Sequence, residues 1–493
     1  MPNLETAPSP QKLRRIAIDP VTRVEGHGKV TILLDEENKV HQVRLHIVEV
    51  RGFEKFIEGR PYWEVPVIVQ RLCGICPVSH HVAAAKAMDI IAGYGTLPPA
   101  AEKLRRLMHY GQMVQSHALH FFHLASPDLL LGFDSDLTRR NIMGVLADFP
   151  EIAKQGVFMR KFGQEVIHHT AGKRIHGTGA IPGGMNKALT QEERDLLRNG
   201  VDQIVEWAIG SVRMIEKLHL TNPRFYNHFA EFGTNMMGLV RSDGAMDLYH
   251  GGLRATDAGK KIIFDHADYS QYDRMLQEGV KPWSYMKFPY IKSLGPEHGW
   301  YKVGPLARVQ ICDFIPSPEA ESERKKMMAM GEGRPVHGTL FYHWARLIEL
   351  LHAAEVIRDL LDDPEILGKD LMADKGPWRG EGVGVIEAPR GTLFHHYRVD
   401  KDDLVTFCNL IVSTTNNNQA MNEAIRAVAL QYLDGCEITE GLLNHIEVAI
   451  RAYDPCLSCA THALGQMPLE VSLQDAAGAM VSRLCRNSDG AIV

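Results

Sequence analysis

Hydrophobic residues recur at helical spacing over five long stretches of the chain, which are 98–124, 191–218, 339–361, 419–433 and 440–453. Apolar side chains three and four positions apart line one side of a helix, so each stretch is predicted to be an amphipathic helix packed on a core. Thr190 and Glu193 have the spacing of a capping box, which marks where the second helix begins.

A different pattern occurs near the N-terminus. Apolar and polar residues alternate over 29–35 and again over 40–50, and the polar residues 36–39 separate the two stretches. Alternation with a period of two places every second side chain on the same face of a strand. The pattern therefore predicts two antiparallel strands joined in a hairpin.

Residues 222–335 show a third sequence pattern. Glycine, proline and aromatic residues interrupt short apolar runs there, which predicts an irregular excursion with short strands and no independent domain. The expected fold is mainly α with minor β. It is one large helical domain with an N-terminal antiparallel β hairpin and a β-containing excursion.

Composition excludes several classes of protein. Of the 493 residues, 45% are apolar and 23% are charged, which is ordinary for a globular protein. The net charge of −6 leaves no basic footprint for nucleic acid. We find no secretory signal and no apolar run long enough to cross a membrane. A cytoplasmic protein without a membrane span is expected.

Two Cys-x-x-Cys pairs stand at opposite ends of the chain, Cys73 with Cys76 and Cys456 with Cys459. Thiolates are soft ligands for zinc, nickel and iron, so four of them brought together by the fold would bind a metal. The other four cysteines are isolated, and we expect them to be buried or inert; they are Cys312, Cys408, Cys436 and Cys485.

Simpler explanations of the pairs fit less well. A local zinc ribbon needs its pairs roughly 12–20 residues apart, and these are far more distant. A thioredoxin-like motif would fit the first pair, because Pro77 opens a predicted helix over 78–91 directly after it. It leaves the second pair unexplained. A four-cysteine zinc scaffold without redox activity stays open as an alternative.

Five short motifs have one common explanation. They are 23–28 (RVEGHG), 51–54 (RGFE), 71–81 (RLCGICPVSHH), 387–391 (EAPRG) and 454–462 (DPCLSCATH). Together, and in this order, they resemble the large, catalytic subunit of nickel–iron hydrogenases, enzymes that reversibly split H2 into protons and electrons. The segments around both cysteine pairs look most like the cytoplasmic, NAD-linked bidirectional (NAD-reducing) group.

The resemblance assigns the cysteines. Cys73 and Cys456 would be terminal thiolates on nickel, and Cys76 and Cys459 would bridge nickel to iron. The iron would carry carbon monoxide and cyanide in a Ni-Fe(CN)2(CO) centre. Cys456 would be the first proton acceptor and Glu25 the relay towards solvent, because heterolytic cleavage needs a base beside the metal.

The resemblance also implies a group of polar side chains, a canopy, that covers the metals. Arg390 follows Pro389 in what is expected to be a rigid turn, and the resemblance places its guanidinium above the open metal position. Asp128 and Asp454 match the aspartates that would hold it by charge-assisted hydrogen bonds. Whether Arg390 or Cys456 is the primary base stays open.

Two further residues would tune the centre. His80 lies four residues after Cys76 and so on the same face of the predicted helix. Its expected role is a hydrogen bond to a bridging sulfur. Thr414, with Thr415 beside it, resembles the hydroxyl residues that lie near a cyanide in the family.

A second cation and a processing step complete the family pattern. Glu54, His462 and a main-chain carbonyl near Leu410 match ligands of Mg2+, which usually keeps several waters. Family precursors are cut after the residue matching His462 by an endopeptidase, once nickel-insertion proteins have acted. The expected domains are 1–462, the hydrogenase domain, and 463–493, a maturation peptide.

The resemblance also implies partners. A small iron–sulfur subunit would take the electrons, and a diaphorase module with FMN would pass them to NAD. A factor F420-linked or heterodisulfide-reductase-linked enzyme is the alternative. A non-catalytic relative, as in respiratory complex I, would lack the nickel cysteines, and all four are present here.

Overall fold

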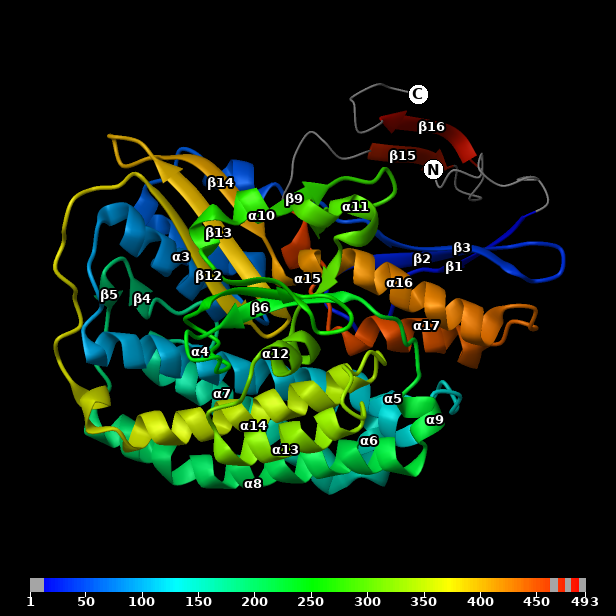
Figure 1. The fold of residues 1–493 in the computed structure, drawn as a ribbon, viewed down its shortest axis with the longest axis horizontal. Coiled ribbons are helices and arrows are strands. Elements are labelled where there is room, and N and C mark those ends of the chain that lie inside the picture. The colour runs from blue at the N-terminus through cyan, green and yellow to red at the C-terminus, as the bar shows by residue number, and fades with distance from the viewer. Residues whose placement is uncertain (1–12, 462–468, 475–479, 487–493) are drawn as a thin grey trace.

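A computed structural model describes residues 13–461 and the backbone of two later strands, β15 (Leu469–Gln474) and β16 (Met480–Arg486). Long helices fill its lower half (Figure 1). They are α4 (Pro99–Leu119), α7 (Pro150–Ala171), α8 (Gln191–Thr221), α13 (Pro318–Ala329) and α14 (Phe341–Asp362). Helix α4 packs against α7 and α14, and α14 packs against α8, so these helices form one bundle beneath the strands.

All five predicted helices are present. The 98–124 stretch is α4 followed by a π-helical segment (His120–Ala125), and the other four are α8, α14, α16 (Asn418–Val428) with a π-helical end, and α17 (Glu440–Ala452). The capping box is confirmed, because Thr190 accepts a hydrogen bond from the Glu193 backbone and Glu193 accepts one from the Thr190 backbone in return.

Two helices of the bundle have no clear signal in the sequence. Helix α7 exposes Val157 and Phe158 on its outer side, so its apolar residues do not form a single stripe. Half of the residues of helix α13 are charged, and the helix lacks an amphipathic pattern. In both, packing on neighbouring helices decides the structure more than local periodicity does.

The N-terminal hairpin is confirmed and carries one more strand. Strands β1 (Arg14–Ile18), β2 (Gly28–Leu34) and β3 (Val40–Ile47) form an antiparallel sheet in that order. Val30 pairs with Leu45 and Ile32 with Val43, and these four side chains are buried. The predicted alternation therefore faces the core as expected.

The excursion contains the expected short strands. A four-stranded sheet has the order β11-β6-β7-β8, and β9 pairs with β10. Their bounds are β6 (Asn235–Val240), β7 (Gly252–Thr256), β8 (Ile262–Ala267), β9 (Leu276–Gly279), β10 (Phe288–Ile291) and β11 (Tyr301–Lys302). Helix α12 (Pro305–Ile311) follows and packs on β6 and α14, which ties the excursion to the bundle.

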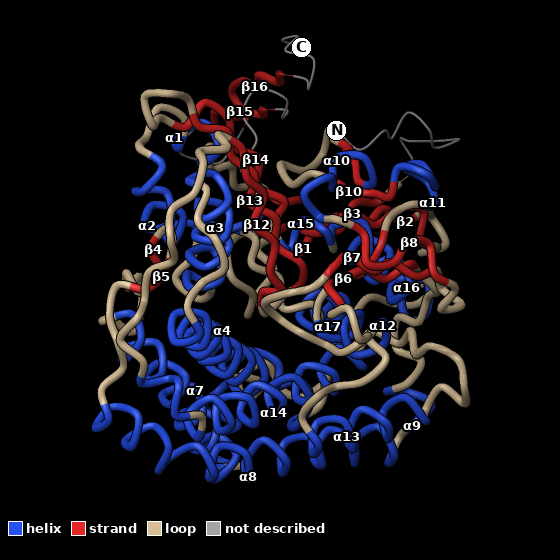
Figure 2. Tube along the Cα trace, turned by 60° about the vertical axis from the view of Figure 1, so that its left-hand side comes forward, coloured by secondary structure: helices blue, strands red, loops and turns tan. Residues whose placement is uncertain are grey.

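Another sheet, which the sequence pattern does not predict, lies above the bundle (Figure 2). It consists of β12 (Glu381–Ala388), β13 (Gly391–Val399) and β14 (Val405–Ile411), all antiparallel. Helix α3 (Pro77–Ala92) covers one face of it. Strands β12 and β13 are buried along nearly their whole length, so they lack the alternation that marks a half-exposed strand.

The core is shared by most of the chain. One cluster of buried apolar side chains extends from Val21 to Ala460 and includes both cysteine pairs. This continuity agrees with the prediction of a single helical domain with minor β structure. None of the described helices is long and apolar enough to cross a bilayer.

The contact between α3 and β12 depends on glycine. A Cβ atom at Gly384 would lie 2.1 Å from the carbonyl oxygen of Ala83 and 2.8 Å from the backbone nitrogen of Ala87. The strand can approach the helix this closely only because no side chain intervenes.

We predict that Gly384→Ala lowers the free energy of unfolding by roughly 1–3 kcal/mol, as overpacking does in a tight core. Urea unfolding of the variant measures this. Gly210→Ala on the exposed side of α8, where a Cβ meets nothing within 4 Å, is the control and should be neutral or stabilising. A Gly384→Ala protein as stable as wild type would contradict the close α3–β12 contact.

Candidate metal centre

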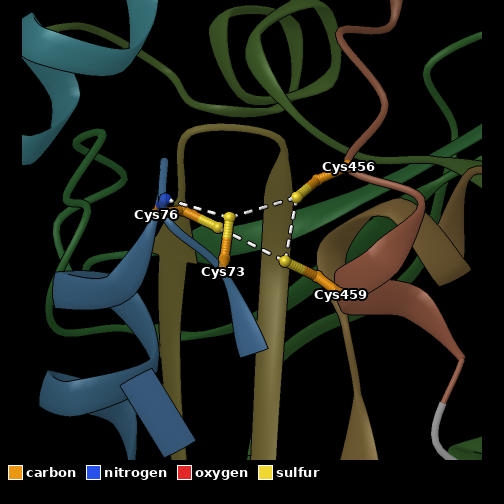
Figure 3. Close-up of side chains that lie close together, drawn as sticks. All are labelled: Cys73, Cys76, Cys456 and Cys459. Carbon is orange, nitrogen blue, oxygen red and sulfur yellow. Dashed lines mark hydrogen bonds between the residues drawn. The ribbon is translucent and has the colours of Figure 1, made fainter. Parts of the chain in front are cut away.

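The two cysteine pairs meet in the core of the molecule (Figure 3). Cys73 and Cys76 immediately precede α3, and Cys456 and Cys459 follow α17. All four Sγ atoms lie within 4.8 Å of one another, and none of the four residues is more than 6% exposed. The Sγ atoms of Cys456 and Cys459 are 2.8 Å apart, and those of Cys73 and Cys456 are 3.3 Å apart.

Such a cluster is suited to a cation. The backbone N–H groups of Ile75 and Cys76 donate to the Cys73 sulfur at 3.1 and 3.3 Å. Hydrogen bonds from the other three thiols hold the pKa of Cys73 well below its ordinary value, while burial raises the pKa values of Cys456 and Cys459. Four buried thiolates require a bound cation to compensate their charge, and their softness fits nickel, iron or zinc.

A small cavity adjoins the sulfur atoms. Cys76 and Cys456 form part of its wall, and the turn Pro389–Arg390 and His80 form another part. Leu393 and Val412 add apolar surface. The cavity thus adjoins the cysteine sulfurs on the side where Arg390 lies.

Arg390 lines the same cavity as Cys76 and Cys456. It occupies the two-residue turn between β12 and β13, since Ala388 pairs with Gly391. Its side chain donates to the carboxylate of Asp454 at 3.0 Å and to the main-chain oxygen of Asp454 at 2.6 Å. Both residues are 3% exposed. The guanidinium is thus fixed over the cavity by a buried ion pair.

The predicted partner Asp128 lies elsewhere. Its carboxylate binds Arg23, Arg451 and Asn444, and the α4 residue that meets Arg390 is Ser116, whose Oγ lies 3.3 Å from Nη1. Twelve helical residues advance about 18 Å, so both positions cannot face the same guanidinium. The expectation that Asp128 holds Arg390 is therefore wrong.

A second arginine, Arg308, supports the turn that carries Arg390. Arg308 on α12 donates to the main-chain oxygens of Ala388 and Pro389 at 2.9 and 3.3 Å. The same guanidinium binds Glu387 and makes two hydrogen bonds to Glu349 on α14. Charge-assisted bonds of this kind restrict orientation strongly, so Arg308 fixes the turn that carries Arg390.

Glu25 reaches the centre directly. Its Oε2 lies 3.0 Å from the sulfur of Cys456 and accepts from the Ser458 backbone at 3.2 Å, and Ser458 Oγ donates to Oε1. The following Gly26 has a φ of 83°, and a Cβ there would lie 2.7 Å from Ser458 N. Only glycine allows the two motifs to approach this closely.

His80 and Thr414 also lie at the site. His80 lines the cavity, and its Nδ1 is 3.1 Å from His395 Nε2. Burial lowers the pKa of His80 to about 4, so the ring is neutral. Thr414 Oγ1 accepts from the backbone of Cys456 at 3.0 Å. The hydrogen bond expected from His80 to a bridging sulfur stays a prediction.

Two of the three residues matched to a magnesium site lie together. Glu54 Oε1 accepts from the Leu410 backbone at 2.9 Å, which brings both positions together near the free edge of β14. Burial raises the pKa of Glu54, and a cation beside it would stabilise the charged form. His462 lies outside the described residues.

Several residues at the site carried no signal in the sequence. Ser116, Arg308 and Glu349 are isolated polar residues in helices, where a surface position is the usual assignment. Ser458 could have been noticed because it lies inside the second cysteine motif. Among the isolated cysteines, Cys312 and Cys408 are buried as expected, but Cys436 is exposed.

Comparisons with known proteins agree with this geometry. A family model described as nickel-dependent hydrogenase matches residues 51–131 and 248–462, and one described as HoxL-like matches residues 15–50. The chain is 49% identical to NAD-reducing hydrogenase HoxS subunit beta of Cupriavidus necator over 489 residues, which cover 96% of this chain and 100% of that protein.

Two further comparisons show similarity to other hydrogenases. The vhc F420-non-reducing hydrogenase of Methanococcus voltae has a subunit that is 43% identical over 471 residues, covering 94% of this chain and 98% of that protein. The crystal structure of an NAD+-reducing NiFe hydrogenase in the H2-reduced state superposes with a TM-score of 0.89 and 57% identity. That match covers 91% of this chain and 99% of the other.

Proposed function

The chain belongs to the nickel-dependent hydrogenase family, and on that premise we propose that it is the catalytic large subunit of an NAD-reducing hydrogenase. The observation that carries the proposal is the buried cluster of four cysteine sulfurs beside an arginine-capped cavity. The chain shares more identity with the NAD-reducing relative, 49%, than with the F420-non-reducing one, 43%. The NAD-linked assignment is therefore favoured over a function like that of the F420-non-reducing relative.

The four cysteines would hold the metals. Cys73 and Cys456 would bind nickel alone, whereas Cys76 and Cys459 would be shared with iron. When bound, the centre supplies the redox chemistry that splits H2 heterolytically and takes up its electrons. The small cavity beside Cys76 would admit carbon monoxide and cyanide on the iron, with Thr414 close to them.

The protein's own groups would handle the proton. Cys456 Sγ and Glu25 Oε2 are 3.0 Å apart, a distance that allows direct transfer between sulfur and carboxylate. Glu25 is only partly buried, so it can pass the proton outward. Ser458, which donates to Glu25 from both its hydroxyl and its backbone, holds the carboxylate against the sulfur.

Arg390 would act on the open side of the cavity. Its fixed positive charge favours negative charge that develops beside the metals, and it needs no reorganisation during the reaction. Asp454 keeps the guanidinium aimed, and Arg308 keeps the turn in place. Glu54, the main-chain oxygen of Leu410 and His462 would hold Mg2+, whose remaining ligands would be waters.

The chain must hand its electrons to other subunits. Within the part of the chain that the structure describes, one four-cysteine group is found, and it is the metal centre itself. We infer a small iron–sulfur subunit beside it and a diaphorase module with FMN that reduces NAD. Because NAD is an intracellular carrier, the complex would be cytoplasmic.

The electron acceptor can be tested on the complex purified with its partner subunits. We expect H2-dependent reduction of NAD+ and none of factor F420. Reduction of a dye by H2, without reduction of NAD+, would leave a hydrogenase but refute the NAD linkage. No H2-dependent reduction of any acceptor, with zinc in the cysteine cluster, would favour the scaffold alternative.

Glu25→Gln should lower H2-dependent dye reduction by roughly 10²–10⁴-fold, the usual contribution of a positioned acid–base group. The neutral amide cannot accept the proton, although its shape still fits beside Ser458. Nickel content should equal that of wild type. Glu437→Gln, at an exposed position, is the matched control. Full activity in Glu25→Gln would exclude Glu25 as the relay.

Segment 463–493 is proposed to be a maturation peptide that an endopeptidase removes once nickel-insertion proteins have loaded the site. The expected mature chain ends at His462. Intact-mass measurement on active complex checks this directly. An active subunit that still ends at Val493 would refute the processing step.

A further inference from the structure

Three buried side chains form a hydrogen-bonded file that ends at the metal cavity. His80 Nδ1 lies 3.1 Å from His395 Nε2, and His395 Nδ1 lies 2.6 Å from the hydroxyl of Tyr397. None of the three residues is more than 1% exposed. The function proposed above assigns no role to His395 or Tyr397.

The file follows from strand geometry. His395 and Tyr397 are two positions apart on β13, so both point to the same face of the sheet. That face is covered by α3, which carries His80. The intervening His396 points the other way and binds Tyr272 and Glu381. The two hydrogen-bonded groups therefore lie on opposite faces of the sheet.

The relative acidities of the groups set the direction of these hydrogen bonds. A phenol O–H is a stronger acid than the N–H of a neutral imidazole, so Tyr397 is the favoured donor to His395 Nδ1. Burial raises the pKa of Tyr397 well above its ordinary value, which keeps the hydroxyl protonated. His395 then carries its proton on Nε2, and this N–H donates a hydrogen bond to Nδ1 of His80.

The hydrogen bond from His395 determines the tautomer of His80. With Nδ1 accepting from His395, the neutral ring of His80 must carry its proton on Nε2. His80 lines the cavity together with Cys76 and Arg390, and this N–H would be the group that it offers to the sulfur atoms there. The opposite direction would leave a bare nitrogen lone pair facing thiolates, which is unfavourable.

We propose that Tyr397 is a positioning residue that acts through His395 to fix the tautomer of His80, so that His80 presents its Nε2–H to the thiolates of the metal centre. This inference rests on the proposed hydrogenase function, because it concerns sulfur ligands of the nickel–iron centre. An N–H donated to a ligand sulfur withdraws electron density from the metals. Tyr397 would thus affect the electron density of the metal centre through His395 and His80, without touching the centre itself.

Tyr397→Phe tests the proposal in the purified complex. Removing the hydroxyl releases the constraint on His395, so the infrared bands of metal-bound carbon monoxide and cyanide should shift from their wild-type positions. H2-dependent dye reduction should fall about tenfold, at the lower end of the effects of such outer residues. Nickel content should not change.

Tyr110→Phe is the matched control. Tyr110 is also fully buried, on α4, and its hydroxyl bonds the main chain at Leu248 rather than the file. Its loss should leave the infrared bands in place. Bands that stay at wild-type positions in Tyr397→Phe, or that shift equally in both variants, would overturn the proposal.

A double-mutant cycle separates positioning from packing. In His395→Gln the amide N–H can donate to His80 Nδ1 without help from Tyr397. Adding Tyr397→Phe to that variant should then cause no further band shift. An undiminished additional shift would overturn the proposed pathway. A wild-type complex without nickel and without these bands would instead refute the hydrogenase function, which keeps the two failures distinct.

Discussion

The structure depends on placing four thiolate sulfurs at one buried point. Cys73 and Cys76 come from the start of α3, and Cys456 and Cys459 come from beyond α17, so the site closes the fold between distant parts of the chain. Burying four negative charges is unfavourable without a cation. Metal binding and closure of this core are therefore linked, as in other proteins whose metal sites contribute to folding.

The surrounding elements position the groups that face this site. Helix α3, which follows Cys76 directly, packs closely on strand β12 at Gly384. The β12–β13 turn carries Arg390 over the cavity, and Arg308 holds the turn through its backbone oxygens. The carboxylate of Glu25 meets the Cys456 sulfur from the N-terminal segment. In the proposed function, proton transfer and electrostatic stabilisation would thus use separate parts of the chain.

Much of this could be predicted from the sequence, for physical reasons. Long helices with one apolar stripe, such as α8, show their periodicity plainly. Strands buried on both faces, such as β12 and β13, do not alternate and were missed. The cysteines and Glu25 were found because they sit in short motifs. The contact expected for Asp128 rests on the resemblance alone, and it fails because Ser116, twelve residues earlier, occupies the position beside Arg390.

The most direct test of the metal centre is X-ray absorption at the nickel edge of the complex purified from its host. We expect nickel bound mainly by sulfur, with an iron atom as its near neighbour. Nickel bound mainly by nitrogen and oxygen, or a fully processed complex that holds zinc in place of nickel, would contradict the assignment of the four cysteines.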